Sequence, residues 1–247
     1  MSQATVNCIF RDSKGFIWLG TNDGLNCYDA YSFRVYRHNR NDAFSISGNT
    51  ITSIAEDSSS NLWIATRNNG LNYYNRKKNT FTRYSHVNGD ESSLLSDNIK
   101  KVTVARNGTV LIGTLGAGLN IYLPEEKKFT AYTNRDGDKN SLSNNFVYSI
   151  VEEGDGKFWI GSDAGTVDLF DTKSGTFKKY RYKEDYRNAS SDIGVSLLKD
   201  KSGDLWIGTN RNGLYKLTVE RGQIAVINGE GSVENMNDKI FTSFVAF

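Results

Sequence analysis

The feature that most constrains this sequence is the regular spacing of its four tryptophans. Trp18, Trp63, Trp159 and Trp206 follow one another at steps of 45, 96 and 47 residues, and Leu111 divides the long step into two of 48. A rare residue at a constant phase indicates internal repetition. We therefore divide the chain into repeats of roughly 47 residues, each with one of these five residues as its anchor.

The residues around the anchors repeat as well. A small residue and a hydroxyl residue follow each anchor, as in Gly20 and Thr21. An acid stands six residues before the anchor in four repeats, at Asp12, Asp57, Glu153 and Asp200. An acid that accepts backbone N–H groups, followed by a glycine such as Gly15, is typical of a tight turn. This turn predicts a hairpin between the first two strands of each repeat.

Within a repeat, apolar and polar residues alternate as in short strands. The fourth repeat has four such segments, at 147–151, 158–161, 167–170 and 177–182. No helical period is present. A four-stranded antiparallel sheet in every repeat predicts an all-β chain, a β-propeller in which each repeat is one blade and the anchors pack between neighbouring blades.

We expect one partial propeller over residues 1–247, a fragment of a larger, seven-bladed ring. Its repeats are expected at 4–48, 49–96, 97–144, 145–191 and 192–238, and the segment 239–247 matches only the first strand of a sixth. Two uncovered end blades would expose apolar surface, which is costly. We therefore expect self-association through the end blades, with Phe241, Phe244 and Phe247 buried.

Composition narrows the class of protein. The chain is 38% hydrophobic, with 30 basic and 28 acidic residues and a net charge of +2. This excludes disorder and gives no overall field that would attract nucleic acid. The basic stretch 178–183 is interpreted as an outer strand whose lysines protect its edge. The first 17 residues do not predict a signal peptide, and no segment reaches membrane-spanning length, so a membrane would be contacted only through other parts of a longer chain.

Metal, cofactor and catalytic sites are not predicted. The two histidines, His38 and His86, lie one blade apart at outer strand ends, which favours solvated positions over metal ligation. The stretch 134–140 alternates oxygen-bearing residues like a calcium loop, but it lacks the required glycine and glutamate. Cys8 and Cys27 fall on the first and third strands of one blade, too far apart for a disulfide.

Ligand recognition in a propeller usually falls on loops at the mouth of the central channel. Two loops of each blade qualify: the one between the second and third strands, and the end of the linker between blades. In the first kind of loop, the candidate ligand-binding residues are Asn22, Asp23, Arg67, Asn68, Asp163, Asn210 and Arg211; Asn49, Asn98 and Asn145 mark the second. Amide, guanidinium and carboxylate groups suit sugar hydroxyls or uronates, although turns also favour Asn and Asp.

The repeat pattern closely resembles that of the two-component regulator propeller family. The residues that carry the resemblance are Asp12, Gly15, Trp18, Gly20 and Thr21 followed by Gly24, Leu25 and Tyr28, their counterparts Asp200, Gly203, Trp206, Gly208 and Thr209, and the linker 141–145. The resemblance covers the whole chain. It implies the periplasmic sensor of a hybrid histidine kinase in Bacteroides-type bacteria, built from paired seven-bladed propellers and responding to oligosaccharides from glycans.

Three functions stay open from the sequence. The first is a non-enzymatic sensor module that binds a glycan fragment and regulates polysaccharide utilisation through a kinase outside this chain. The second is a propeller enzyme, a lyase or glycan hydrolase, for which no catalytic group stands out. The third is a protein-interaction scaffold.

Overall fold

The computed structural model describes residues 1–163, 165–182, 195–210, 213–219 and 223–226. Its contacts divide the chain into two compact units, 1–131 and 132–247, and each is described by itself. The expected sixth-repeat strand at 239–247, with Phe241, Phe244 and Phe247, lies outside the described residues.

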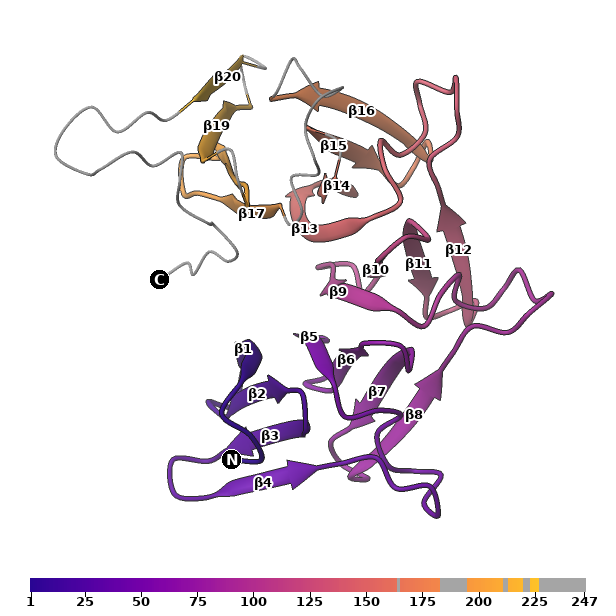
Figure 1. Cartoon of the computed structure of the whole chain (residues 1–247), viewed down its shortest axis with the longest axis vertical. Helices are drawn as coiled ribbons and strands as arrows, with labels where there is room; N and C mark the ends of the chain where they lie inside the picture. Colours follow the sequence, from indigo (N-terminus) through magenta and orange to yellow (C-terminus); the bar gives the residue numbers. More distant parts are fainter. Residues whose placement is uncertain (164, 183–194, 211–212, 220–222, 227–247) are drawn as a thin grey trace, which may run out of the picture. The chain divides into compact units, whose positions relative to one another are not determined.

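Unit 1 contains three antiparallel sheets of four strands, each with its strands in sequence order (Figure 1). The first sheet consists of β1 (Val6–Arg11), β2 (Ile17–Thr21), β3 (Gly24–Tyr28) and β4 (Phe33–Tyr36). The second consists of β5 (Ile51–Glu56), β6 (Leu62–Thr66), β7 (Leu71–Asn75) and β8 (Thr80–Tyr84). The third consists of β9 (Ile99–Val104), β10 (Val110–Thr114), β11 (Leu119–Leu123) and β12 (Lys128–Tyr132), whose last residue opens unit 2.

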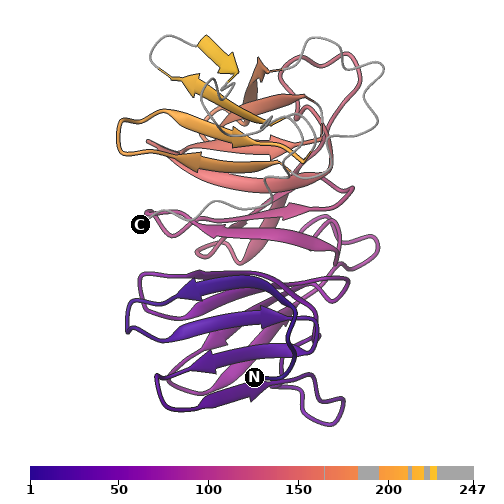
Figure 2. The ribbon, with the colours of Figure 1, turned by 60° about the vertical axis from the view of Figure 1, so that its left-hand side comes forward.

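Unit 2 contains two further sheets of the same topology. The fourth sheet consists of β13 (Val147–Gly154), β14 (Lys157–Ser162), β15 (Thr166–Asp171) and β16 (Thr176–Arg181). The fifth consists of β17 (Ser196–Lys199), β18 (Leu205–Gly208), β19 (Leu214–Thr218) and β20 (Gln223–Val226). The predicted all-β fold, with one four-stranded blade in each of five repeats, is confirmed, and the same stacked antiparallel strands can be followed in Figure 2.

Among the described residues, no helix has the length and apolar character that crossing a membrane requires.

The predicted hairpin turns form as the residue types dictate. Asp12 Oδ1 accepts the backbone N–H groups of Lys14 and Phe16 at 3.0 and 2.9 Å, and Gly15 has a φ of +88°. Asp57 and Asp200 accept N–H groups at the equivalent turns. Glycine adopts this φ at the lowest cost, and the equivalent Ser60 of the second blade also has a positive φ, of +61°.

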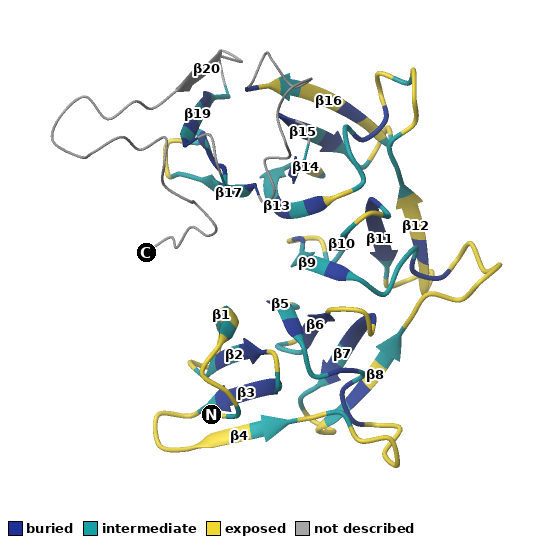
Figure 3. Cartoon of the chain, in the orientation of Figure 1, coloured by how far each residue is buried: buried dark blue, intermediate teal, exposed yellow. Residues whose placement is uncertain are grey.

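The five anchors occupy the same position on the second strand of each blade, as expected. Trp18 is 1% exposed and contacts Tyr74 of the next sheet, with 5.8 Å between ring centroids. Trp63 contacts Tyr122 of the third sheet in the same way, at 5.3 Å. Leu111 is fully buried, Trp159 lies in one core cluster with Leu205 and Leu217 of the fifth sheet, and Trp206 is half-buried on β18. Figure 3 shows buried residues concentrated on the middle strands of the blades of unit 1, such as β6, β7, β10 and β11, and exposed residues on the outer strands β4 and β12.

A buried polar residue on the third strand of each of the first four blades holds the linker that leads into that blade. Asn72 Oδ1 accepts the Ser47 N–H at 2.8 Å, and its Nδ2 donates to Ser47 Oγ at 2.8 Å. The equivalent residues are Asn26 with Ser2, Asn120 with Leu95, and Asp168 with Ser143. We call this contact the linker clamp.

The linker also bonds to the outer strand of the blade that follows it. The N–H of Phe81 donates to Phe44 O at 2.9 Å, and that of Phe129 donates to Ser92 O at 2.9 Å. In unit 2, Phe177 N donates to Asn140 O at 3.0 Å. Each of these linkers is thus attached to the following blade at two places.

The two cysteines lie on different strands of the first blade, as predicted. Cys8 is on β1 and Cys27 on β3, with β2 paired to both strands between them. Both thiols are free. Burial raises the pKa of each to about 11, which makes them weak nucleophiles at neutral pH.

Candidate ligand-binding site

The two kinds of loop singled out in the sequence lie together in unit 1. Gly24 N donates to Asn49 O at 2.7 Å, Arg67 N donates to Thr50 O at 2.9 Å, and Gly70 N donates to Asp97 O at 3.0 Å. Backbone hydrogen bonds therefore join each second-to-third-strand loop to a linker end. The loops form one polar edge of the sheets, which we call the loop edge: residues 21–24, 49–50, 66–70 and 97–98.

The candidate side chains of unit 1 differ in their contacts. Asp23 forms an ion pair with Arg37 at 2.9 Å, and both side chains are about half exposed. Asn22 is exposed, and its Oδ1 accepts from Asn7 Nδ2 at 2.9 Å. Arg67 and Asn68 are exposed, and Asn68 has a φ of +65°, which Asn tolerates better than most residues.

The candidates of unit 2 are described in part. Asp163 follows β14, and its carbonyl accepts from Asn144 Nδ2 at 3.0 Å. Asn210 is half-buried two residues beyond β18. Arg211 lies outside the described residues.

The linker asparagines Asn49 and Asn145 have a structural role, and their counterpart in the third blade is Asp97, not the predicted Asn98. Asn49 Oδ1 accepts the His38 N–H, and Asn145 Oδ1 accepts the Asn134 N–H, both at 2.7 Å. The equivalent residue in the linker between them is Asp97, which accepts the His86 N–H at 2.7 Å, and not Asn98. Asn98 Oδ1 is buried, and among the described residues it has no hydrogen-bond partner. An aspartate side chain accepts this N–H group as well as an asparagine does, so the presence of asparagine at 98 did not identify the linker residue.

Two lysines were missed in the sequence, and one of them, Lys100, lies close enough to Arg67 for their charges to interact. Lys100 and Lys101 are half-buried on β9, an inner strand that packs beside β5. Burial lowers the pKa of both side chains, and the positive charge of Arg67 lowers the pKa of Lys100 further. The available signal was two consecutive lysines inside a strand where other repeats have Thr52-Ser53 or Tyr148-Ser149.

This part of unit 1 carries a concentration of positive charge. Arg67 is exposed next to Asn68, its charge acts on Lys100, and Lys100 acts in turn on Lys101. Guanidinium and ammonium groups bind carboxylates and sulfates, and amides bind hydroxyls. In the part of the chain that the structure describes, no cluster of His, Cys, Asp and Glu could hold a metal ion.

Repeated four-stranded blades with polar loops at one edge define a β-propeller repeat protein. The family described as two-component regulator propeller matches residues 1–23, 45–68, 141–164 and 189–211. These four segments are two-component regulator propeller repeats.

Known proteins with similar sequence or structure agree with this. A stretch of 47 residues is 47% identical to Histidine kinase P4 of Formosa agariphila, covering 19% of this chain and 3% of that protein. The extracellular domain of BT3049 from B. thetaiotaomicron, assigned as a hybrid two-component system, is 26% identical with a TM-score of 0.76. That similarity covers 91% of this chain and 30% of the domain.

The extracellular domain of BT4673 from the same organism, assigned as a one-component system, has a TM-score of 0.70 at 23% identity. That similarity covers 92% of this chain and 31% of the domain. The chain therefore spans under a third of each of these extracellular domains. At 23% identity, the similarity to BT4673 supports the fold alone.

Proposed function

We propose that this chain is part of an extracytoplasmic, periplasmic sensor module of a hybrid two-component system. The observation that carries the proposal is the similarity to the extracellular domain of BT3049, which extends over 91% of this chain. The matching stretch of Histidine kinase P4 is as long as one repeat. In this proposal the chain binds a ligand, performs no catalysis, and biases a kinase that lies outside it.

The proposed ligand is a glycan-derived oligosaccharide that bears carboxylate or sulfate groups, and the response is regulation of polysaccharide utilisation. The exposed guanidinium of Arg67 can form paired hydrogen bonds with a carboxylate. Lys100 and Lys101 add positive charge at partly buried positions, where an anion meets less screening than at the open surface. Asn22 and Asn68 offer amides for sugar hydroxyls.

The test is calorimetry with a panel of neutral, uronate-containing and sulfated oligosaccharides, combined with analysis of the products. Binding of anionic members without new products supports the proposal. Arg67→Gln and Lys100→Gln should each weaken binding about tenfold, because each removes a charge-assisted hydrogen bond or ion pair. Arg135→Gln, a change of an arginine that is paired with Asp138 in an exposed linker, serves as the matched control.

The same experiment separates the alternatives. Turnover of any oligosaccharide would indicate a propeller enzyme, and the absence of both binding and turnover would favour an interaction scaffold. Because the pKa values of Lys100 and Lys101 are lowered, they lose their charge at a lower pH than ordinary lysines. Affinity for an anionic oligosaccharide should therefore begin to fall at a lower pH than with normal lysines, and an affinity that rises with pH would contradict the assignment.

A further inference from the structure

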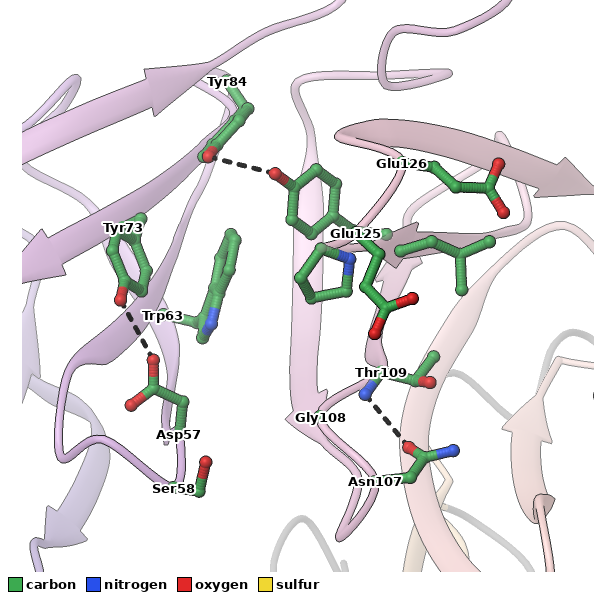
Figure 4. Close-up of a pocket in the computed structure, with 13 residues that line it drawn as sticks. Asp57, Ser58, Trp63, Tyr73, Tyr84, Asn107, Gly108, Thr109, Glu125 and Glu126 are labelled. Carbon is green, nitrogen blue, oxygen red and sulfur yellow. Dashed lines mark hydrogen bonds between the residues drawn. The ribbon is translucent and has the colours of Figure 1, made fainter.

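A cavity of about 510 Å³ opens between the second and third blades of unit 1, at the end of the sheets that carries the β5–β6 and β11–β12 turns. Figure 4 shows Asp57 and Trp63 on one side of it and Thr109 and Glu125 on the other. Among the described residues that line the cavity there are three carboxylates and neither a lysine nor an arginine. One of them, Glu126, is paired with Lys128, whereas Asp57 and Glu125 have no cationic partner in the described chain.

The walls of this cavity have a counterpart between the first and second blades. Trp18 stacks on Tyr36 with 6.0 Å between ring centroids, and Trp63 stacks on Tyr84 at 5.7 Å. The hydroxyls of Tyr36 and Tyr74 are 3.0 Å apart, and those of Tyr84 and Tyr122 are 3.5 Å apart. The acids Asp12 and Asp57 hold equivalent turns. The two sites are therefore built from the same aromatic residues and the same acid.

Between the first and second blades, the guanidinium of Arg76 occupies this site. Its Nη2 donates to Asp12 Oδ2 at 2.7 Å, and its Nε donates to Ser60 O at 2.8 Å. Its guanidinium carbon lies 5.6 Å from the ring centroid of Trp18 and 5.9 Å from that of Phe16. The Arg76 side chain is only 17% exposed, and that of Asp12 is fully buried. An acid and an aromatic face thus hold a cation in a largely desolvated place, where such contacts are strongest.

The third blade has a proline at the position of that arginine. Arg76 directly follows β7 and Pro124 directly follows β11, and the registers agree because Leu62 pairs with Tyr74 and Val110 pairs with Tyr122. A proline ring has no charge and cannot reach Asp57 as a guanidinium would. The cavity beside Trp63 is also larger, at about 510 Å³ against about 330 Å³ for the space that is left beside Arg76 in the neighbouring site.

The other acids at this repeat position have a cation beside them. Lys199 Nζ lies 2.9 Å from Glu153 Oε1, in the blade of Trp159. Lys216 Nζ lies 3.9 Å from Asp200 Oδ2 and 5.2 Å from the ring centroid of Trp206. Within the described residues, Asp57 is the acid of this series that has a tyrosine hydroxyl as its partner instead: Tyr73 donates to its Oδ2 at 3.1 Å.

From these contacts we infer that the cavity between the second and third blades binds an alkylguanidinium group from outside the chain. Asp57 is the anionic partner, Trp63 supplies the aromatic face, and Glu125 at the mouth provides a second carboxylate. The ligand takes the position that the side chain of Arg76 takes in the neighbouring site. This site is separate from the loop edge and does not depend on the proposed oligosaccharide.

The test is a titration of the full chain with agmatine, followed through the tryptophan indole N–H resonances. The Trp63 signal, assigned with Trp63→Phe, should shift saturably, whereas N-butylurea, which is neutral, should leave it in place. Asp57→Asn keeps the oxygen that accepts the turn N–H groups of Ser59 and Asn61, so the variant should fold. It should weaken agmatine binding about tenfold or more, which corresponds to about 1.4 kcal/mol.

Two further variants, each with a matched control, guard against a purely structural effect. Pro124→Arg supplies the chain's own guanidinium, so it should abolish agmatine binding and raise the melting temperature, whereas Pro124→Met should bind agmatine normally. Glu125→Gln, an exposed change, should weaken binding several-fold, and Asp136→Asn, an exposed acid outside the cavity lining, should not. Equal binding of N-butylurea, or unchanged binding by Asp57→Asn or Pro124→Arg, would overturn the inference.

A second ligand shows whether the natural guanidinium belongs to a small molecule or to an arginine side chain of a partner protein. An acetylated, amidated Gly-Gly-Arg-Gly peptide presents the same group from a polypeptide. If it binds as tightly as agmatine, the natural ligand is an arginine side chain of a partner; if agmatine alone binds, it is a small molecule.

Discussion

At the scale of single residues, the acid six positions before the anchor has two tasks in the first and fifth blades. In the first blade, Asp12 accepts the turn N–H groups and also accepts the indole N–H of Trp18 at 2.8 Å. Burial alone would raise the pKa of Asp12, but the hydrogen bonds from Trp18 and Arg76 hold it below its usual value. Trp159 and Trp206 donate to Glu153 and Asp200 in the same way. The acid therefore orients the tryptophan in these three blades, and Asp12 and Asp200 form the turn as well.

Removing the cation beside such a buried acid should be costly. We expect Arg76→Met to lower the free energy of unfolding by about 3 kcal/mol, because Asp12 is left charged and buried without its ion-pair partner. Urea denaturation measures this. Arg135→Met, which breaks an exposed pair with Asp138, should change stability by less than about 0.5 kcal/mol, and an equally small effect of Arg76→Met would contradict the argument.

Asp168 predicts an unusual pH dependence of stability. Burial raises its pKa to about 6, although hydrogen bonds from Ser143 oppose the change. A raised carboxyl pKa means that the folded chain binds more protons than the unfolded one, so the stabilisation is complete below about pH 4 and is lost as pH rises through about 6.

Asp168→Asn should remove this loss, because Asn forms the linker clamp in the first three blades. At pH 7 the variant should be more stable than the parent by about 1–3 kcal/mol, and the two should converge near pH 4. Thermal melts from pH 4 to 8 check this, with Asp136→Asn as the exposed control. Parallel pH profiles of parent and Asp168→Asn would refute it.

At the scale of elements, the linker clamp is incomplete in one blade. Asn120 accepts the Leu95 N–H at 2.9 Å, but among the described residues its buried Nδ2 has no acceptor, because Leu95 lacks the hydroxyl of Ser47. An unsatisfied buried donor costs free energy that a partner would recover.

Leu95→Ser should therefore be more stable than Leu95→Ala by about 0.5–1 kcal/mol. Leu95→Ala is the matched control, since it removes the same apolar side chain and adds no acceptor. Chemical denaturation should place the serine variant above the alanine variant. If serine is no better than alanine, the hydroxyl does not complete the clamp.

Much of the fold could be predicted from the sequence, and less of the candidate site. The Trp18 series and the alternation in segments such as 147–151 depend on local spacing, so they located every blade. The partners of a side chain depend on packing across blades, which the alternation does not contain. Arg76 contacts Asp12, 64 residues away in the sequence, and Lys100 lies near Arg67. Both contacts follow only from how neighbouring blades pack together. Asn49 and Asn145 were candidate ligand residues because an amide suits a sugar hydroxyl. The same amide group also accepts an N–H of the linker, and this is the role that the structure shows for both residues.

At the scale of the whole molecule, the first blade exposes an apolar side chain whose counterparts in the next two blades are buried. Ile9 on β1 is 70% exposed, whereas its counterparts Ile54 and Val102 are 7% and 1% exposed. Ile54 shares a core cluster with Trp18, and Val102 shares one with Trp63, so this repeat position normally contacts the preceding blade. Ile9 is therefore the residue through which we expect the first blade to take part in self-association.

Ile9→Glu should reduce self-association of the 247-residue chain without unfolding it. Sedimentation velocity at micromolar concentration is the measurement, and Tyr31→Glu, which changes a side chain that is 95% exposed in a turn, is the control. A parent chain that sediments as a monomer would show that the end-blade association does not occur.

The double attachment of each linker to the blade that follows it has a consequence for engineering. A cassette that is to be transplanted between propellers should begin where an outer strand ends and finish at the end of the next outer strand, as in residues 85–132. Such a cassette keeps both the Leu95–Asn120 contact and the bond from Phe129 N to Ser92 O. A cut just before β9 would separate both pairs, and the transplanted blade would lose the two contacts that attach its linker.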